Sequence, residues 1–454
     1  MTKNTTYQLP PKSPRYRSLI RLQRFIQNPI PFINDNLKKY GDTYNFSLRY
    51  SKVNILTINP DVIQHILRKN VANYEKPISH SDALGRFIGK GLLLATGEDH
   101  TRQRALMAPG FRPKKMGALV DLMDQEIDLY FEKLDQRIEQ NSQINIATEM
   151  KAMTFRVMSK AIFSDDMTKE MIEDFAQRFD TLQDFFVKLV RLPALMKWYN
   201  LNGKTKHYEK VANTNNQVLL DIIAKRRNRP LDDDLLGMLM GCVYEDTQQG
   251  MTDKQLQEES LILFIAGHET AANILSWIFY LLHENPEAIV KIKKEEKEIL
   301  GNRKPTFADL MRMEYLNQTI DECLRLYPPS WITDRVALED DEVEGFLIPK
   351  GSRVIPFIYG LHRSEKLWEN PTQFDPTRFS KENRKERHNF AHMPFGAGPR
   401  QCIGRHFATT EMKMIILKLL ERYDFKLVKN QKVEILPLVT LRPKGGIHFN
   451  FSKK

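Results

Sequence analysis

The sequence predicts one large, mainly α-helical domain with small β-sheets. Apolar residues recur at helical spacing along most of the 454 residues, whereas strand-like alternation is confined to a few short stretches. The length alone would suggest two or three domains. However, no Pro/Gly/Ser linker, internal repeat or low-complexity tract divides the sequence, and 41% of its residues are hydrophobic, which is enough for one sizeable core.

The first hundred residues contain the main non-helical features. Prolines lack an amide donor and disfavour a regular helix near the start, while Asn-Pro-Asp is a typical beginning of a helix. The expected elements are, in order, an N-terminal arm over residues 1–42 that is extended from Pro10 and ends in a short helix from Pro31 to Tyr40, a hairpin (43–48 and 53–58), a helix from Asn59 to Leu67, and a long irregular segment over 70–95.

Helical spacing then dominates up to residue 300. The pattern over 255–283 is the longest and is apolar all round, so we expect that helix to be buried. Four phenylalanines of the 171–192 pattern are expected in the core: Phe175, Phe179, Phe185 and Phe186. The other expected helices begin at Gly97 or span 115–138, 147–163 and 203–229, and one more begins at Pro286; strands are expected at 343–348 and 353–358, and a turn between strands at 439–446.

Charge and cysteine content limit the partners and the compartment. The net charge is +11, with Lys and Arg scattered rather than massed, which favours an acidic redox protein as partner; no nucleic-acid motif is present. Cys242, Cys323 and Cys402 are odd in number and far apart, which indicates a reducing compartment. The N-terminus has no signal-peptide pattern, and no stretch approaches the ~20 apolar residues of a membrane span. We therefore expect a soluble, cytoplasmic protein with at most peripheral membrane contact.

Polar and small residues interrupt the long apolar helix at Ala266-Gly267-His268-Glu269-Thr270. A glycine inside a helix costs ~1 kcal/mol relative to alanine, and a buried carboxylate costs more unless it is paired. Such conflicts are expected at functional sites. We expect Ala266 and Gly267 to let a flat ligand approach the backbone, and Thr270 to donate a hydrogen bond to the Ala266 carbonyl.

Cys402 lies in a different kind of environment, a loop with three glycines and a proline that leads into a helix over 406–417. A helix N-terminus favours negative charge, so a thiol placed there tends to ionise and to become a soft ligand for iron. A lone cysteine is more often an inert core residue. The residues around Cys402 decide between the two interpretations.

The stretch Phe395-x-x-Gly-x-Arg-x-Cys402-x-Gly resembles the signature of the cytochrome P-450 family. The resemblance runs from the hairpin at residue 43 to the last strand. It implies the cytochrome P-450 fold over 43–454, with no fused reductase and with haem b bound through Cys402. The Ala-Gly-x-Glu-Thr stretch is similar to the motif of the family's helix on the distal face of the haem, where Glu269 and Thr270 would help deliver protons during oxygen activation.

The same resemblance implies roles for other residues. Phe395, Arg400 and Ala266 would contact the haem, and His100, Arg104 and Arg335 would bind its propionates. Glu322 and Arg325, with Arg378, would form a buried network that supports the cysteine loop. Taken alone, a His and an Arg four residues apart, or a Glu-x-x-Arg pair, is more typical of a solvated helix surface. The expected substrate pocket consists of Phe87, Phe264, Trp331, Ile332 and Val439.

The implied activity is a haem-dependent monooxygenase that hydroxylates an apolar substrate. Its electrons would come from NAD(P)H through a reductase and a ferredoxin or flavodoxin. The segments around Trp331 and Val439 are most similar to bacterial members that act on fatty acids or carotenoids, and a terpenoid is also compatible. Two alternatives remain open: a haem-thiolate peroxygenase or isomerase, which would typically lack the Glu-Thr pair, and a non-catalytic haem sensor or electron carrier.

Overall fold

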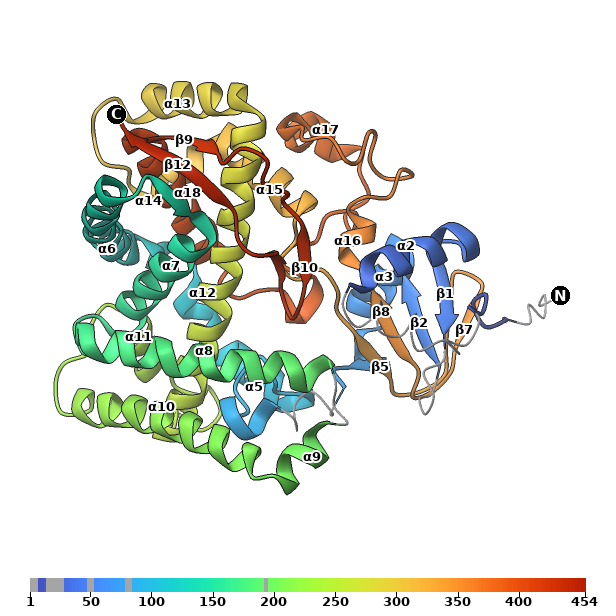
Figure 1. The fold of residues 1–454 in the computed structure, drawn as a ribbon. Coiled ribbons are helices and arrows are strands. Elements are labelled where there is room, and N and C mark those ends of the chain that lie inside the picture. The colour runs from blue at the N-terminus through green and yellow to red at the C-terminus, as the bar shows by residue number, and fades with distance from the viewer. Residues whose placement is uncertain (1–6, 14–27, 47–52, 78–83, 192–194) are drawn as a thin grey trace. The chain divides into compact units, whose positions relative to one another are not determined.

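The computed structural model describes residues 7–13, 28–46, 53–77, 84–191 and 195–454. The chain forms two compact units, each made of several chain segments. Unit 1 comprises Met1–Ile78, Asp321–Cys402 and Leu436–Leu441, and unit 2 comprises Ser79–Ile320, Ile403–Ile435 and Arg442–Lys454. Helices dominate and the sheets are small, which confirms the predicted fold class (Figure 1).

Unit 1 is organised by a five-stranded sheet of order β1-β2-β8-β5-β3. β1 and β2 form the predicted antiparallel hairpin, with Thr43 opposite Thr57, and β8 lies parallel to β2. All four residues of β2 are buried, so the middle of the sheet is also the core of the unit. The strands are β1 (Thr43–Phe46), β2 (Asn54–Thr57), β3 (Tyr74–Glu75), β5 (Arg335–Ala337), β6 (Asp341–Val343), β7 (Phe346–Ile348) and β8 (Arg353–Pro356).

Short helices flank this sheet. The Asn59 side chain accepts the amide hydrogens of Asp61 and Val62, and this cap starts α3 as expected. α3 then continues as a wider π-turn over His65–Lys69. The predicted strand over 343–348 was wrong in its extent: Glu344 and Gly345 both have positive φ, so they form a turn between β6 and β7. The helices of unit 1 are α2 (Pro29–Tyr40), α3 (Pro60–Gln64), α16 (Ile358–Leu361) and α17 (Lys381–Lys385).

Unit 2 is a helical assembly built around α12 (Asp253–Glu284), which α7, α10 and α18 all contact (Figure 1). β12 pairs antiparallel with β4 and β9. The other elements are α5 (Gly97–Met107), α6 (Pro113–Gln140), β4 (Gln143–Asn145), α7 (Ile146–Phe163), α8 (Lys169–Arg191), α9 (Leu195–Leu201), α10 (Lys204–Arg226), α11 (Leu235–Met240), α13 (Pro286–Leu300), α14 (Phe307–Arg312), α18 (Arg405–Arg422), β9 (Tyr423–Leu427) and β12 (His448–Lys453). The chain crosses the boundary between the units within α15 (Glu314–Leu326), and β10 (Ile435–Pro437) and β11 (Leu441–Pro443) contain further boundaries.

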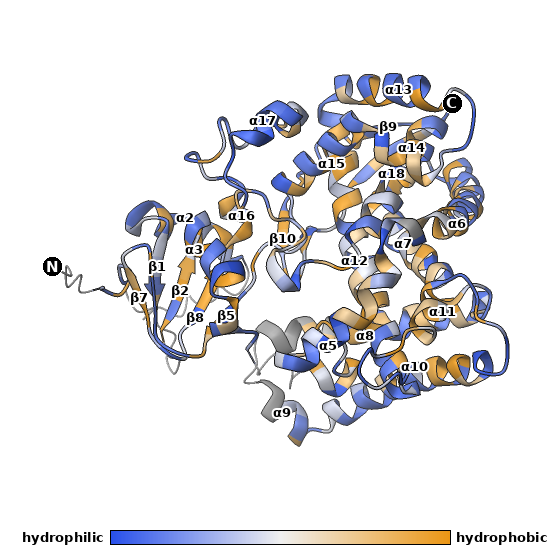
Figure 2. Ribbon diagram, turned by 180° about the vertical axis from the view of Figure 1, so that it is seen from behind, coloured by the Kyte–Doolittle hydropathy of each residue, from blue (hydrophilic) through white to orange (hydrophobic). Residues whose placement is uncertain are grey.

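Most predicted helices are confirmed within a few residues. The pattern over 203–229 corresponds to α10, which covers 204–226, and the short helix α9 that precedes it was not predicted. The four phenylalanines of α8 are buried, as expected for core residues. The outer helix α13 has hydrophilic and hydrophobic faces (Figure 2) and buries Ala288, Ile292 and Leu300. Parts of some predictions lie outside the described residues: 1–6 and 14–27 of the N-terminal arm, 47–48 of the hairpin and 78–83 of the long loop.

The central helix α12 corrects one expectation about membranes. It begins at a capping box formed by Thr252 and Gln255 and is 32 residues long. By length and composition it is apolar enough to cross a bilayer, so the statement that no stretch approaches this limit was wrong. In the structure, 67% of its most apolar window is buried among protein atoms, which equally fits the core helix of a globular unit.

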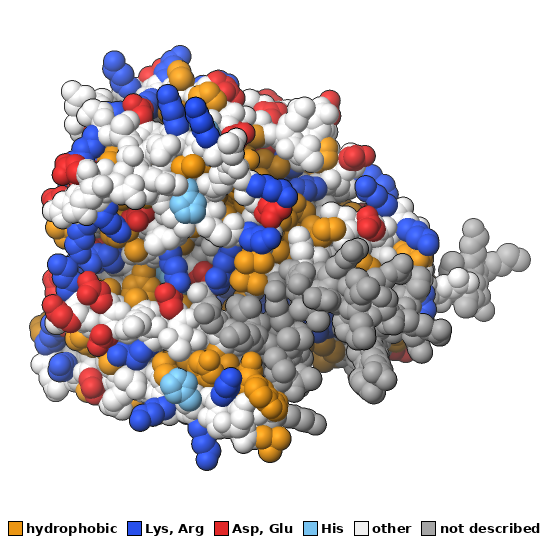
Figure 3. Space-filling view, in the orientation of Figure 1, with side chains coloured by type: hydrophobic (Ala, Val, Ile, Leu, Met, Phe, Trp, Pro, Cys, Tyr) orange, Lys and Arg blue, Asp and Glu red, His pale blue; other side chains and the backbone are white. Residues whose placement is uncertain are grey.

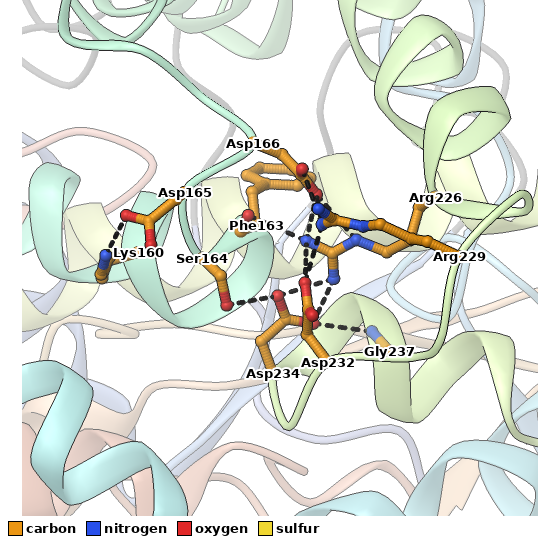
Figure 4. A network of polar contacts seen from close by, with 10 residues as sticks. All are labelled: Lys160, Phe163, Ser164, Asp165, Asp166, Arg226, Arg229, Asp232, Asp234 and Gly237. Carbon is orange, nitrogen blue, oxygen red and sulfur yellow. Dashed lines mark hydrogen bonds and ion pairs between the residues drawn. The ribbon is translucent and has the colours of Figure 1, made fainter.

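A buried charge network fixes the end of α10 against α7 and α11 (Figure 4). The Arg226 guanidinium is fully buried and donates to both carboxylate oxygens of Asp234, to Asp166 and to the Phe163 carbonyl. Asp234 also caps α11 by accepting the Gly237 amide hydrogen at 2.8 Å. Each nitrogen of the Arg226 guanidinium donates to an acceptor. If either partner is lost, the other remains as a buried charge without its counter-ion, which is unfavourable in the protein interior.

We expect the substitution Arg226→Ala to lower the free energy of unfolding by about 3–5 kcal/mol, because Asp234 would then be a buried charge without its cation. The neighbouring Arg227→Ala is the matched control. Arg227 pairs with Asp253 through side chains that are about half exposed, so its loss should cost less than about 1 kcal/mol. Urea unfolding followed by circular dichroism measures both; equal losses would contradict the assignment.

Candidate functional site

The loop that carries Cys402 has a backbone that only glycine adopts easily. Gly396 and Gly398 have φ angles of +70° and +69°, in the left-handed region. A Cβ atom on Gly398 would overlap the Leu67 carbonyl, so the loop lies directly on the π-turn that follows α3. The Cys402 amide hydrogen is donated to the Phe395 carbonyl at 2.8 Å. The result is a fixed loop that presents an exposed thiol, with α18 beginning three residues later in the chain, as predicted.

The other two cysteines lie in environments that oppose ionisation. Cys323 is fully buried and Cys242 is half-buried, and burial raises the pKa of both thiols. All three cysteines belong to the described residues, and none of them forms a disulfide. Since the thiolate rather than the thiol binds metals, Cys402 is the strongest candidate for a metal ligand.

Three cations crowd together in unit 1. Burial and the charges of Arg400 and Arg335 lower the pKa of Lys76 to about 7. Burial and the charge of Arg400 lower the pKa of Arg335 to about 10, although Asp334 opposes the shift. Burial also lowers the pKa of Arg400, against the influence of Glu75. A cluster in which one cation lowers the pKa of its neighbours would stabilise an anion placed among them.

The predicted network of Glu322, Arg325 and Arg378 is present and buried. Arg325 donates to both oxygens of Glu322 at 2.7 Å, and neither side chain is exposed. Arg378 pairs with Glu322 at 3.5 Å, and the Asp375 amide hydrogen also reaches this carboxylate at 2.9 Å. The remaining Arg325 hydrogens are donated to the carbonyls of His362, Pro371 and Gln373. The network therefore ties α15 to the chain that leads towards Cys402.

One face of α12 is less covered by protein than the rest. Leu263, Ala266 and Thr270 follow the i, i+3, i+7 pattern; Ala266 is exposed and the other two are partly exposed, while most of the helix is buried. The Thr270 hydroxyl donates to the Ala266 carbonyl at 2.7 Å, which confirms the predicted hydrogen bond. A small residue and a hydroxyl are thus the groups that α12 offers to a ligand on this face.

The neighbouring carboxylate, Glu269, is held by residues from two other elements. Arg442 in β11 donates to one of its oxygens at 2.6 Å, and the Gln183 amide in α8 donates to the other. Glu269 is 13% exposed, so this pairing offsets the cost of burying its charge. The expected conflict in the middle of α12 is therefore real, and long-range partners resolve it.

Gly267 has a different role from the one predicted. A Cβ atom at this position would overlap the side chain of Met158 in α7, so the glycine allows two helices to pack closely rather than a ligand to approach. His268 also faces the core: it is fully buried, its Nδ1 lies 2.9 Å from the Phe264 carbonyl, and burial lowers its pKa to about 4. Ala266 and Thr270 alone keep the predicted orientation towards a less covered face.

The expected pocket residues divide into core and surface positions. Phe264 is fully buried against the rings of Phe155, Phe175 and Phe179, and its pocket role stays a prediction. Phe87 is also buried, against Phe185 and Phe186 of α8.

In unit 1, the Trp331 indole donates to the Leu438 carbonyl at 2.9 Å, which brings it beside the turn of Val439. Val439 is 51% exposed and Ile332 is partly buried. The pocket role of Phe87, Trp331, Ile332 and Val439 stays a prediction.

His100 and Arg104 both lie in α5 of unit 2. His100 is 6% exposed and Arg104 is partly buried. Arg335 and Arg400, in contrast, belong to the cation cluster of unit 1. The structure thus supports a shared electrostatic role for Arg335 and Arg400, and the propionate role of His100 and Arg104 stays a prediction.

Sequence reasoning missed three polar residues of these sites. Lys76 completes the cation cluster, and Arg442 and Gln183 hold Glu269. Arg442 lies in the 439–446 segment that was singled out, but 173 positions separate it from Glu269. A buried carboxylate in an apolar helix did signal that a cation must be near; nothing in the sequence signalled which one.

The chain belongs to the cytochrome P450 family, whose model matches residues 8–450 and so spans both units. It is a cytochrome P450 monooxygenase. It is 29% identical to cyclooctat-9-en-7-ol 5-monooxygenase of Streptomyces melanosporofaciens over 88% of this chain and 86% of that protein. It is 30% identical to cytokinin hydroxylase of Arabidopsis thaliana over 85% of this chain and 77% of that protein. Its fold matches the crystal structure of the cytochrome P450DA heme domain with a TM-score of 0.87, at 21% identity, over 99% of this chain and 98% of the other.

The family implies a haem iron cofactor, and the residues of unit 1 fit such a group. The exposed thiol of Cys402 is a suitable iron ligand. The cluster of Lys76, Arg335 and Arg400 would bind the two carboxylates of a haem, which would relieve the mutual repulsion of these cations. When bound, the haem supplies the redox chemistry by which molecular oxygen is activated.

We expect Glu322→Ala to lose haem, because it leaves Arg325 and Arg378 as buried cations and releases the chain that leads to the cysteine loop. The ratio of Soret to protein absorbance in the purified protein should fall at least several-fold. The adjacent Asp321→Asn is the control, since Asp321 pairs with Arg384, a side chain that is 46% exposed. Full haem content in Glu322→Ala would refute the supporting role of the network.

Proposed function

We propose that the protein hydroxylates a large apolar molecule, with a terpenoid as the first candidate and a carotenoid or fatty acid next. It does so with haem b bound through Cys402. One atom of molecular oxygen enters a C–H bond of the substrate and the other leaves as water, with two electrons and two protons consumed. Thr270 and Glu269 assist the delivery of those protons, and Lys76, Arg335 and Arg400 hold the propionates.

The observation that carries this proposal is the less covered face of α12. An intact alcohol lies there beside a paired carboxylate: Thr270 is bonded to the helix backbone and Glu269 to Arg442. A haem isomerase or dehydratase has no need to supply protons to oxygen. The presence and positioning of both groups therefore support oxygen insertion over the alternatives.

The substrate class rests on the names of relatives and on the side chains of the expected pocket. Cyclooctatin synthase and cyclooctat-9-en-7-ol 5-monooxygenase, both of Streptomyces melanosporofaciens, are 28% and 29% identical to this chain. The second name describes oxygenation of a cyclic alkenol, a largely apolar molecule. Trp331 and Val439, brought together by the Trp331–Leu438 hydrogen bond, add apolar surface suited to such a substrate.

The electron donor is proposed to be a small acidic ferredoxin or flavodoxin, reduced by an NAD(P)H-dependent reductase. The net charge of +11 favours such a partner. On the face shown in Figure 3, Lys and Arg side chains are interspersed with Asp and Glu rather than gathered in one patch, so docking would use a local group of cations. We place the protein in the cytoplasm, where cysteines remain reduced.

A spectral binding screen tests the substrate class directly. Terpenoids, carotenoids and fatty acids are titrated into the ferric haem protein, and displacement of water from the iron shifts the Soret band. We expect saturable shifts with large apolar terpenoids and none with small polar compounds. Cys402→Ala is the control, because it should lose the absorbance of the reduced carbon monoxide complex that a thiolate ligand gives. A shift with polar compounds alone would refute the proposed substrate class.

We expect Thr270→Ala to retain haem but to waste electrons. Removing the hydroxyl next to Ala266 removes one group that assists proton delivery, so product formed per NAD(P)H should fall several-fold while hydrogen peroxide rises. Thr270→Ser keeps the hydroxyl and should retain most of the coupling. Unchanged coupling in the alanine variant would contradict the role of Thr270.

A further inference from the structure

Two adjacent carboxylates of α12 hold a loop of unit 2 by its backbone. Glu258 accepts the Lys90 amide hydrogen at 3.1 Å, and both oxygens of Glu259 lie 3.0 Å from the Leu92 amide nitrogen. This loop, residues 89–92, belongs to the long irregular segment over 70–95, which also contains Phe87, one of the expected pocket residues. None of the roles assigned above involves either carboxylate.

The loop is shaped to fit these two side chains. Gly89 has a φ of +77°, and a Cβ atom there would overlap the Glu258 side chain. A Cβ atom on Gly91 would lie 2.9 Å from a carboxylate oxygen of Glu259, closer than ordinary contact. Glycine is therefore favoured at Gly89 by both its backbone and its neighbour, whereas at Gly91 a larger residue would have to displace the Glu259 or Ile262 side chain.

The held loop is continuous with buried parts of the unit. Phe87, just before it, packs on Phe185 and Phe186 of α8, and Leu94 and Ala95, just after it, are each 6% exposed. Glu259 itself is 2% exposed. It lies seven residues before Ala266 and eleven before Thr270, so all three share one face of α12.

The charge state of Glu259 depends on whether the loop is closed. In the closed loop, burial raises its pKa from the ordinary value of 4.5 to about 7; the Glu258 charge adds to the shift and the Leu92 amide opposes it. Among the described residues, no cation from the helices packed on α12 contributes to this shift. A solvated Glu259 in an open loop would keep the ordinary value.

The linkage between the two states has a definite sign. A group whose pKa is higher in the closed state stabilises that state at low pH, and this contribution is lost as the pH rises from the open-state pKa to the closed-state pKa. For Glu259 the window runs from pH 4.5 to about 7. Within it, the open loop gains population on the order of tenfold per pH unit, and above about pH 7 the effect levels off.

We propose that Glu258 and Glu259 form a latch that fastens residues 89–92 to α12, and that deprotonation of Glu259 loosens this latch and opens the Ala266–Thr270 face to substrate. The latch itself stands on the geometry of unit 2. The admission of substrate rests on the proposed function, in which this face of α12 meets the reacting molecule.

Hydrogen–deuterium exchange of the Leu92 amide in the haem-bound protein measures the latch without any substrate. After correction for intrinsic exchange rates, protection at Leu92 should fall on the order of tenfold per pH unit between pH 5.5 and 7 and then level off. Glu259→Gln keeps an acceptor for the amide but cannot ionise, so its protection should be independent of pH. A flat profile in the unchanged protein, or the same slope in Glu259→Gln, would overturn the latch.

Two controls separate this effect from general changes in stability. Glu296 on α13 is another glutamate whose pKa burial raises to about 7, so Glu296→Gln should leave the slope at Leu92 unchanged. Glu258→Ala removes the acceptor of the Lys90 amide, so it should lower protection at Lys90 while the pH dependence at Leu92 persists, because Glu258 only adds to the shift in the pKa of Glu259. If the pH dependence of protection at Leu92 were lost in Glu296→Gln, it would come from a global change in stability, and the latch would be refuted.

Stopped-flow binding of an apolar ligand found in the spectral screen tests the second half of the proposal. The association rate should rise with pH over the same window in the unchanged protein and should be slow and pH-independent in Glu259→Gln. If protection at Leu92 falls with pH but the association rate of the ligand stays constant, the latch exists but the loop does not control the entry of substrate. If no apolar ligand shifts the haem spectrum, the proposed function fails, while the exchange result still decides the latch.

Discussion

The constraint on which unit 2 depends is that α12 is buried on most of its surface but carries polar side chains. A buried polar group without a hydrogen bond costs on the order of 1–3 kcal/mol, and a buried charge costs more. Each functional polar group of α12 therefore has a partner: Thr270 bonds back to its own helix, while Glu269 and Glu259 reach α8, β11 and the 89–92 loop. Satisfying these groups fixes the elements that surround the face of α12 that carries Ala266 and Thr270.

Unit 1 buries cations, whereas α12 in unit 2 buries carboxylates and a hydroxyl. The Arg325 charge is neutralised by Glu322, and its remaining hydrogens are donated to three carbonyls of the chain. The side chain therefore holds α15 to the chain that follows. Arg400 lowers the pKa of both Lys76 and Arg335, and Arg335 lowers that of Lys76, so this cluster would instead stabilise an anion from outside the chain. The Arg325 cluster, whose cation is paired within the chain, therefore fits a structural role. The cluster of Lys76, Arg335 and Arg400 fits the binding of haem carboxylates.

Local features of the fold could be predicted from the sequence, since they depend on neighbouring residues. The Asn59 cap, the hairpin at residue 43, the limits of α12 and the Thr270–Ala266 hydrogen bond are all of this kind. The Glu322 network was also predicted, but through a family motif rather than through physics. A local signal was overlooked at Glu344-Gly345, where a turn splits the expected strand.

Long-range packing could not be predicted in the same way. Helical periodicity states that a residue is buried but not what buries it. Gly267 was therefore assigned to a ligand although a Cβ atom there would overlap Met158, and the three rings that pack on Phe264 were not predicted. Arg442 and Lys76 were missed for the same reason, because the fold alone brings them to their partners.

In the proposed function, the hydrogen bonds on α12 also limit how protons can be delivered. The Thr270 hydroxyl hydrogen is donated to the Ala266 carbonyl, so towards a ligand this side chain offers only acceptor lone pairs. Glu269, which accepts from Arg442 and Gln183, is likewise an acceptor in its ionised form. Two acceptors cannot pass a proton between them without a donor, so delivery requires water that donates to Thr270 or Glu269 and is replenished from solvent. In the proposed function, Thr270 and Glu269 would therefore act by orienting water, and a substitution of Thr270 by alanine would remove one of the acceptors that hold this water.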